Sequence, residues 1–424
     1  MQSPTEFLTQ IDQLLEDRNG ELISLRRELH SHPELSHKEY ETTAMLAATL
    51  EDIGFEVHVR EEGTGFYADL VPDGFNPKTD PTVAIRTDID ALPIKELNDI
   101  PYRSQDDGVM HACGHDVHMT VATGAGIAIK EVCENLSGRL RLLYQHAEEV
   151  SPGGAAEMVS FGAVEGVDAI LALHCDPELE VGRIGVREGH LTAAFDRFEF
   201  KIIGKSGHGA RPHHCTDPVR VATQVANALY QVPSQYFDSR DSVVISIGAI
   251  YGGDSPNVIP EEVTMTGTIR TLSSESRAKM EPLLQKVAGG ICMGHGASYE
   301  LDIESGAPSV FNDSKVIGVV EDVAREVLGD TGVYEIPLPS MGGEDFAYYL
   351  QHTPGAMFRL GTAGPGPRAR HFLHSSKFDV DERAIGIGAR ILARSALELM
   401  SRLATGEERF KRPRPRPVPE GIAE

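Results

Sequence analysis

The sequence lacks several features that would place it in particular classes of protein. It has no tryptophan, only five cysteines, and no apolar run near the roughly 20 residues that span a bilayer. Five dispersed cysteines do not make a disulfide framework and indicate a reducing compartment. The N-terminal 20 residues also lack the basic and apolar regions of a secretory signal. We therefore expect a cytoplasmic protein without a membrane span.

Basic residues are scarce relative to acidic ones. The chain has 39 Lys and Arg against 64 Asp and Glu, giving a formal net charge of -25. This balance argues against nucleic acid and against an anionic membrane surface as partners, because both bind basic surfaces. The simplest interpretation of the charge is a solvated acidic surface. At 424 residues, the chain also exceeds the usual size of one hydrophobic core, which predicts two domains.

The first part of the chain alternates strand and helix patterns. Apolar spacing predicts helices at 5–31 (as a hairpin or one broken helix), 38–53, 119–133 and 153–161. Short apolar runs predict strands at 55–59, 65–70, 82–86, 139–145 and 168–173. Such alternation is typical of an α/β domain whose mixed sheet is largely parallel and flanked by helices.

From about residue 191 the pattern changes. A strand-helix-strand-strand-helix-strand order is predicted, with elements at 197–203, 217–231, 242–250, 262–271, 274–292 and 298–303. This is the ferredoxin-like order of an α+β domain. We expect one domain built from 1–190 and 305–405, interrupted by a second, inserted domain at 191–304. The Pro-rich end, 406–424, is expected to be disordered.

Residues 111–118, His-Ala-Cys-Gly-His-Asp-Val-His, hold four side chains that can bind a metal or move a proton: His111, Cys113, His115 and His118. Buried imidazoles need partners to offset their desolvation, whereas metals such as zinc accept imidazole nitrogen and thiolate sulfur. The alternative is that these histidines are ordinary surface residues.

Polar residues also follow three predicted strands. Asp88 follows 82–86, Glu148 and Glu149 follow 139–145, and His174 follows 168–173. Open α/β sheets place their sites beyond the carboxyl ends of the strands, so we expect these residues to converge with the 111–118 motif. With His374 added, the set suits a two-metal hydrolase in which one glutamate binds metal and its neighbour acts as general base. A solvated loop is the alternative for the glutamate pair.

From about 20 to 400, the chain resembles the aminoacylase/carboxypeptidase family of dinuclear metallohydrolases. It is most similar to the branch of hippurate, N-acyl-amino-acid and indoleacetyl-amino-acid amidohydrolases. The matching stretches include RRELHSHPELSHKEYET, RTDIDALPI, MHACGHDVHMT, QHAEE, GKSGHGARPH, SPNVIPEEVTMTGTIRT and GGEDFAYY. The resemblance implies a zinc-peptidase-like catalytic domain with an inserted ferredoxin-like lid.

The resemblance also implies two divalent metal ions per subunit, zinc or else manganese, cobalt or nickel. The implied ligands are Cys113, His115, Glu149, His174 and His374, with Cys113 bridging as a thiolate and Glu148 as general base. Arg86 stands where many relatives outside the branch carry a metal-binding histidine. Asp88 and Asp116 are expected to orient ligands, or else to cap loops, and His111 and His118 have packing or orienting roles.

In the lid domain, the resemblance implies that His208 stabilises the oxyanion, often from the neighbouring subunit. Asn257 and Arg270 match positions that bind the substrate's free carboxylate, and Gly343 would bring backbone close to the substrate. Alternatively, His208 is a surface residue and Arg270 forms a structural salt bridge. His213 and His214 are taken as surface residues. A homodimer or higher homo-oligomer through the lid is expected.

These residues together predict a metal-dependent amidohydrolase. It would cleave acetyl-, benzoyl- or indoleacetyl-type N-acyl-L-amino acids to a carboxylic acid and an amino acid, with a metal-activated water and Glu148 as base. The alternatives are a dipeptidase or aminopeptidase of the same superfamily, or a non-catalytic binding protein on this scaffold.

Overall fold

The computed structural model describes residues 4–132, 136–366 and 368–408, and the chain forms two compact units. Unit 1 is the chain up to Leu191, Phe311–Leu338, and the chain from Asp345 onward; unit 2 is Thr192–Val310 with Pro339–Glu344. The last of these segments was predicted to belong to the catalytic domain. Most of the predicted disordered tail, 409–424, lies outside the described residues.

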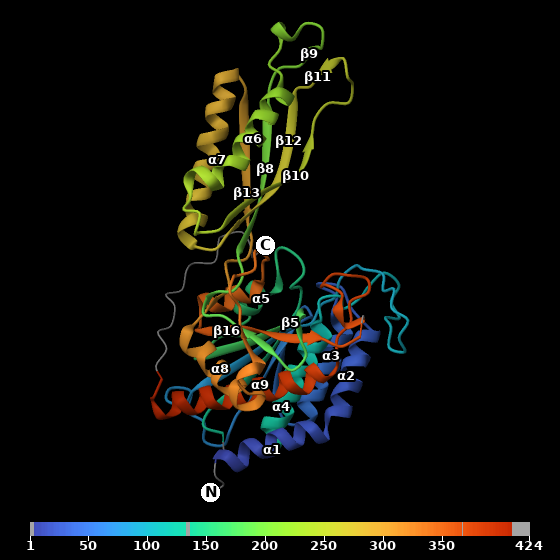
Figure 1. Cartoon of the computed structure of the whole chain (residues 1–424), viewed down its shortest axis with the longest axis vertical. Coiled ribbons are helices and arrows are strands. Elements are labelled where there is room, and N and C mark those ends of the chain that lie inside the picture. Colours follow the sequence, from blue (N-terminus) through green and yellow to red (C-terminus); the bar gives the residue numbers. More distant parts are fainter. Residues whose placement is uncertain (1–3, 133–135, 367, 409–424) are drawn as a thin grey trace. The chain divides into compact units, whose positions relative to one another are not determined.

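Unit 1 is built on a mixed sheet with the strand order β1-β2-β4-β3-β5-β16-β6-β15 (Figure 1). The central strands β4, β3, β5 and β16 are mutually parallel, whereas β1, β2 and β6 join by antiparallel pairs. The predicted largely parallel sheet is therefore confirmed. The strands are β1 (Glu56–Val59), β2 (Phe66–Leu70), β3 (Thr82–Asp88), β4 (Arg139–Gln145), β5 (Ala169–Glu180), β6 (Ile184–Val186), β15 (Val333–Glu335) and β16 (Gly355–Ala363).

Helices cover both faces of this sheet. One face carries α4 (His115–Val132) and α9 (Arg383–Thr405), with α1 (Pro4–Asp17) and α2 (Asn19–Ser31) packed against them. On the other face lie α5 (Gly154–Ser160) and the short helix η3 (Asp345–Gln351) (Figure 1). The helix α3 (Tyr40–Asp52) contacts β1 and β2, and α8 (Ser314–Leu328) contacts β16.

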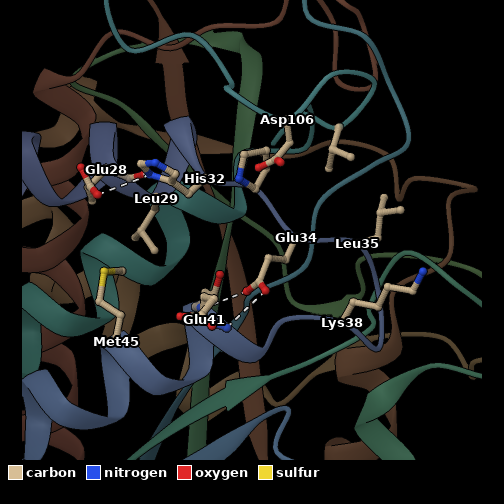
Figure 2. A pocket seen from close by; sticks show the side chains of 12 residues that line it. Glu28, Leu29, His32, Glu34, Leu35, Lys38, Glu41, Met45 and Asp106 are labelled. Carbon is tan, nitrogen blue, oxygen red and sulfur yellow. Dashed lines mark hydrogen bonds and ion pairs between the residues drawn. The ribbon is translucent and has the colours of Figure 1, made fainter.

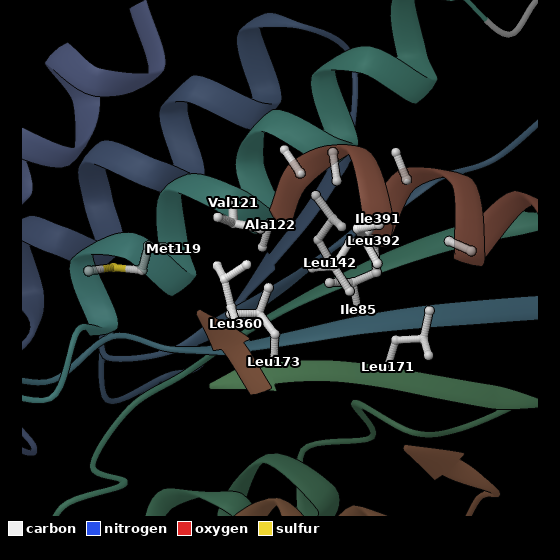
Figure 3. Packing of buried hydrophobic residues seen from close by; sticks show 14 of the residues in the cluster. Ile85, Met119, Val121, Ala122, Leu142, Leu171, Leu173, Leu360, Ile391 and Leu392 are labelled. Atoms are coloured by element: carbon white, nitrogen blue, oxygen red, sulfur yellow. The ribbon is translucent and has the colours of Figure 1, made fainter. Parts of the chain in front are cut away.

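The core of unit 1 lies between α4, α9 and the central strands, as Figure 3 shows. Ile85, Leu142 and Leu360 from three strands are fully buried there against Val121 and Ile391 of the helices. Each such side chain contributes roughly 1.5–3 kcal/mol through removal of its apolar surface from water.

Two details of unit 1 differ from the prediction and both affect the site. The helix α4 begins at His115 instead of residue 119, directly after Gly114, whose φ of +89° turns the chain. The strand β5 continues to Glu180, so His174 lies within the strand and not after its end, because β16 pairs with β5 along this extension. Arg86 of β3 pairs with Ala172, which still leaves His174 level with the end of β3.

Unit 2 has the ferredoxin-like order of strands and helices. Its antiparallel sheet runs β10-β12-β8-β13, and Phe200, Leu229 and Leu284 lie in its own core. The elements are β8 (Ala194–Ile203), α6 (Pro218–Tyr236), β10 (Val243–Tyr251), β12 (Glu262–Thr271), α7 (Ser274–His295) and β13 (Ser298–Ser305), with a separate pair of β9 (Gly207–His208) and β11 (Val258–Ile259).

Smaller elements complete the chain. They are the paired strands β7 (Gly189–His190) and β14 (Phe311–Asn312) and the short helices η1 (Pro212–His214), η2 (Asp330–Gly332) and η4 (Arg368–Arg370). Within the described ranges, we find no helix with the length and apolar character needed to cross a membrane. The cytoplasmic location stays a prediction.

Candidate metal centre

The side chains predicted as ligands meet at one end of the sheet of unit 1. Ligand atoms of Cys113, His115 and His174 lie within 4.8 Å of one another, and the same holds for Cys113, Glu149 and His374. His115, Glu148 and Glu149 form a third such group. The structure therefore brings together all of the predicted ligands and the predicted base.

Each of these residues comes from a different part of the fold. Cys113 precedes α4, and His115 opens that helix. Cys113 Sγ lies 3.5 Å from His174 Nε2 on β5. Glu149, in the loop after β4, places Oε1 3.7 Å from His115 Nε2 and 3.5 Å from His374 Nε2. The group is open to solvent at His374, whose side chain is 53% exposed, whereas that of Glu149 is 9% exposed.

The donor atoms of the cluster fit a bound cation. His115 Nε2 and Glu149 Oε1 are buried and have no hydrogen-bond partner within the described part of the chain. Buried polar atoms without partners are costly, so these two atoms indicate a ligand between them. Burial and the nearby Glu149 raise the pKa of the Cys113 thiol, so a thiolate there would need a cation. Sulfur, imidazole and carboxylate donors together suit zinc and its neighbours.

Two aspartates behind the cluster orient its histidines. His115 Nδ1 donates to the backbone oxygen of Asp90 at 2.8 Å and lies 3.3 Å from Asp90 Oδ1. His118 Nδ1 donates to Asp88 Oδ1 at 2.7 Å, and its Nε2 accepts from the backbone N–H of Cys175. These contacts leave Nε2 of His115 as the atom facing the cluster. The sequence places Asp90 in the same polar stretch as Asp88, but no role was predicted for it.

Arg86 sits beneath these aspartates as a fully enclosed cation, 2% exposed. It donates to Asp88 Oδ2 at 2.8 Å, to Gln145 Oε1 at 2.8 Å and to Asp345 Oδ1 at 2.9 Å. Burial alone would raise the pKa of Asp88, but His115, His118 and Arg86 hold it well below its usual range. Arg86 therefore keeps Asp88 ionised as a partner for the histidines.

Asp116 of the same motif contacts side chains of α2, and His111 is buried. Asp116 Oδ2 accepts from Arg26 Nε at 2.7 Å and from His30 Nδ1 at 2.8 Å, which ties α4 to α2. Burial would raise the pKa of Asp116, but Arg26 and His30 hold it well below its usual range. Burial lowers the pKa of His111 to about 4, so its ring is neutral, which suits the packing role expected for it.

A second group of histidines in unit 1 does not suit a metal. Ligand atoms of His37, His146 and Glu157 also lie within 4.8 Å of one another. The guanidinium of Arg60, however, lies 2.7 Å from His146 Nε2 and is paired with Glu157. A resident positive charge among the donors opposes the binding of a metal cation.

A pocket of about 630 Å³ in unit 1 is lined by none of the predicted ligands. It is formed by the end of α2, the following loop and the start of α3 (Figure 2). Leu29, Leu35 and Met45 contribute its apolar lining, whereas Glu34 turns its carboxylate toward the first turn of α3 (Figure 2).

Four predicted site residues belong to unit 2, where they form two pairs. His208 on β9 pairs with Val258 on β11, and the backbone oxygen of Asn257 accepts from the N–H of Gly209 at 2.8 Å. Arg270 donates to the backbone oxygen of Met341 at 2.8 Å and lies over the ring of Phe195. A Cβ on Gly343 would lie 3.4 Å from Cβ of the same Phe195.

These two pairs lie toward opposite ends of the unit 2 sheet. The segment with His208 is hydrogen-bonded to Glu261, just before β12, whereas Arg270 stands near the last residue of β12. Eight steps along the strand from Glu262 to Arg270 span about 26 Å, and Figure 1 shows β9 and β11 beyond one end of the sheet. Within one chain, Asn257 and Arg270 are therefore too far apart to bind the same carboxylate.

Comparison with known proteins agrees with this architecture. The model of peptidase family M20/M25/M40 matches residues 84–398. An N-acetyl-L-cysteine deacetylase of Bacillus subtilis is 39% identical over 90% of this chain and 88% of its own length. The thermostable carboxypeptidase 2 of Saccharolobus solfataricus is 36% identical over 90% of this chain and 96% of its own.

A solved structure extends the likeness to the fold. The crystal structure of a dinuclear metal-binding peptidase of the M20 family from Bacillus subtilis superposes with a TM-score of 0.79 at 35% identity, covering 91% of this chain and 99% of that one. This chain carries a clustered set of sulfur, nitrogen and oxygen donors at one end of its own α/β sheet. The chain belongs to peptidase family M20/M25/M40 and is a hydrolase that acts on amide or peptide bonds.

Proposed function

We propose that the protein is a metal-dependent amidohydrolase that cleaves N-acyl-L-amino acids to a carboxylic acid and an amino acid. The observation that carries this proposal is the position of Glu148 beside Glu149 in the group that includes His115. A relative at 39% identity is named as an N-acetyl-L-cysteine deacetylase, which is the same class of reaction. Acetyl, benzoyl and indoleacetyl conjugates are the substrates to try first.

The predicted ligands Cys113, His115, Glu149, His174 and His374 would hold two divalent ions. Cys113, like His115 and Glu149, occurs in more than one of the ligand groups, and it would bind as a thiolate. When bound, such ions lower the pKa of a water molecule and polarise an amide carbonyl. Zinc suits the thiolate and imidazoles, and manganese, cobalt and nickel are the other candidates.

Glu148 is assigned the proton transfers. Its carboxylate takes a proton from the attacking water and then gives that proton to the leaving amine, so that the amino acid departs neutral at nitrogen. The adjacent Glu149 is held as a ligand and does not compete for this role. His208 is assigned to the oxygen that gains negative charge during attack.

We infer that His208 and Asn257 serve the active site of a second copy of this chain. Their separation from Arg270 along β12 supports this inference, because one chain alone cannot bring both pairs to one substrate. The edge strand β10 exposes Ile250 and Tyr251 and is open to pairing with another copy.

The oligomeric state tests this inference, and sedimentation velocity should give a dimer. Mixing and refolding two inactive variants, His208→Ala and Glu148→Gln, should restore about a quarter of the activity; a monomer, or a mixture without activity, would contradict the inference.

The proposed function is tested by Glu148→Gln and Cys113→Ala on a panel of N-acyl amino acids, with each candidate metal. Glu148→Gln should bind metal normally and lose about 10²–10⁴-fold in kcat. Cys113→Ala should lower the metal content measured by elemental analysis. Retained turnover in the first variant would remove Glu148 as the base, and unchanged metal stoichiometry in the second would remove Cys113 as a ligand.

The same panel separates the alternatives. A dipeptidase or aminopeptidase requires a free α-amino group, so it would cleave dipeptides and reject their N-acetylated forms. A non-catalytic binding protein would take up metal and substrate without turnover.

A further inference from the structure

The backbone just before Glu148 has an unusual conformation. In the described ranges, the non-glycine residues with positive φ are His37 (+62°), Ala147 (+50°) and His374 (+63°). Left-handed conformations cost a residue with a Cβ roughly 1–2 kcal/mol and persist only where neighbouring groups hold them. Ala147 directly precedes the predicted base, so whatever holds Ala147 also sets the direction of Glu148.

The group that holds Ala147 is the side chain of Glu39. This carboxylate is 0% exposed and comes from the residue that precedes α3. Its Oε1 accepts from the N–H of Ala147 at 2.8 Å and from the N–H of His37 at 3.0 Å. A single carboxylate oxygen therefore binds the backbone N–H groups of two residues in left-handed conformations, which are 110 positions apart in the chain.

The peptide on the other side of Glu148 is held in the same manner. Asp90 Oδ2 accepts from the N–H of Glu149 at 3.0 Å and from the hydroxyl of Ser36 at 2.7 Å. Ser36 and Glu39 thus hold the loop that carries Glu148 and Glu149 (the acidic loop), Ser36 through Asp90 and Glu39 by direct contact.

We propose that Glu39 is a positioning residue for catalysis: by binding the N–H of Ala147, it aims the carboxylate of Glu148 at the cluster. The proposal rests on the assignment of Glu148 as general base. A displacement of about 1 Å in a reacting group can lower the rate about 100-fold. Loss of the Ala147 contact should therefore lower kcat and leave KM and metal binding nearly unchanged, since Glu149 keeps its own contact with Asp90.

The test compares three substitutions of Glu39 in the metal-loaded protein. Glu39→Ala removes the acceptor and should lower kcat about 100-fold, with KM and metal content within about threefold of the original. Glu39→Gln keeps an acceptor oxygen and should retain kcat within about fivefold. Glu39→Asp keeps a carboxyl group on a side chain shorter by one methylene, so it cannot contact the N–H of Ala147. Its kcat should fall about as far as that of Glu39→Ala. This variant replaces Glu39→Ala in the test if the latter does not fold.

Glu34 provides a matched control. It is another carboxylate that accepts two backbone N–H groups, but these belong to Glu41 and Thr42 at the start of α3 and not to the acidic loop (Figure 2). Glu34→Ala should lower the melting temperature and leave kcat unchanged. If Glu39→Ala or Glu39→Asp retains full kcat, or if Glu39→Gln loses as much as Ala, Glu39 does not position the base.

Amide hydrogen exchange gives a readout that does not depend on turnover. Peptides covering 146–150 should exchange faster in Glu39→Ala than in Glu34→Ala, because the N–H of Ala147 loses its acceptor. If the exchange rate of these peptides is unchanged in Glu39→Ala, Glu39 does not hold the backbone of Ala147. If Glu148→Gln keeps its activity, the proposed function fails, yet this exchange experiment still decides whether Glu39 holds the loop.

Discussion

Glu39 also makes the stability of the protein depend on pH. Burial and the neighbouring Asp90 raise the pKa of Glu39 from 4.5 to about 7, although its backbone hydrogen bonds oppose the shift. Between pH 4.5 and 7, the folded protein therefore binds more protons at this site than the unfolded chain. The contribution of Glu39 to the free energy of unfolding is complete below pH 4.5 and is lost as the pH rises through 7, by up to about 3 kcal/mol.

Glu39→Gln should remove this pH dependence. Relative to the original protein, the variant should gain stability between pH 5 and pH 8, because it has no carboxyl group to ionise there. Urea unfolding of both proteins across that range measures the difference. A difference that stays constant with pH would show that Glu39 does not titrate in this window.

At the scale of single residues, the sequence reveals those whose side chains would take part directly in metal binding or proton transfer. Cys113 and His115 stand out because thiol and imidazole groups are rare and closely spaced. Glu39 and Asp90 act on backbone N–H groups, and nothing in a lone carboxylate predicts which distant peptide it will reach. The roles of Glu39 and Asp90 therefore became visible only in the folded chain.

At the scale of the element, α4 positions the cluster through its small residues. A Cβ on Gly126 would lie 2.6 Å from Leu142 Cδ1, and one on Gly124 would lie 3.0 Å from Leu22 Cδ1. The helix thus lies close enough to the sheet and to α2 for His115 and His118 to reach the aspartates.

Gly126→Ala should therefore destabilise the protein by about 1–3 kcal/mol, because Leu142 is fully buried and has little room to move. Gly318→Ala in α8 is the matched control, since a Cβ there meets nothing within 4 Å. It should gain about 0.5–1 kcal/mol from the better helix former. Chemical denaturation measures both, and equal effects would show that the packing of α4 tolerates a methyl group.

The long helices α6 and α7 were predicted at 217–231 and 274–292, within about five residues of their observed ends. The continuation of β5 past His174 was not, because it depends on pairing with β16, which is about 180 residues away in the chain. The short strands β6, β7, β14 and β15 were also missed, because two or three residues are too few to form a recognisable strand pattern.

At the scale of the whole molecule, the two units have separate cores, and the clustered donors belong to unit 1 alone. Metal added to the metal-free protein should raise the melting temperature of one of two calorimetric transitions. When the free metal concentration is about 100 times the dissociation constant, the bound metal should stabilise unit 1 by about 2.7 kcal/mol. A chelator should reverse it. A single transition that shifts as a whole would show that the units unfold together.

The insertion of unit 2 also has a consequence for the order of folding during synthesis. Unit 2 has all four sheet strands and both helices once residue 305 has been made, whereas β5 of unit 1 must wait for β16 at 355–363. The pairing of Phe311 with His190 then joins the two sides of the interruption within unit 1. We expect the later-starting unit to fold first on the ribosome, while the nascent first half, with Cys113, His115 and Glu149, waits for the strand that completes its sheet.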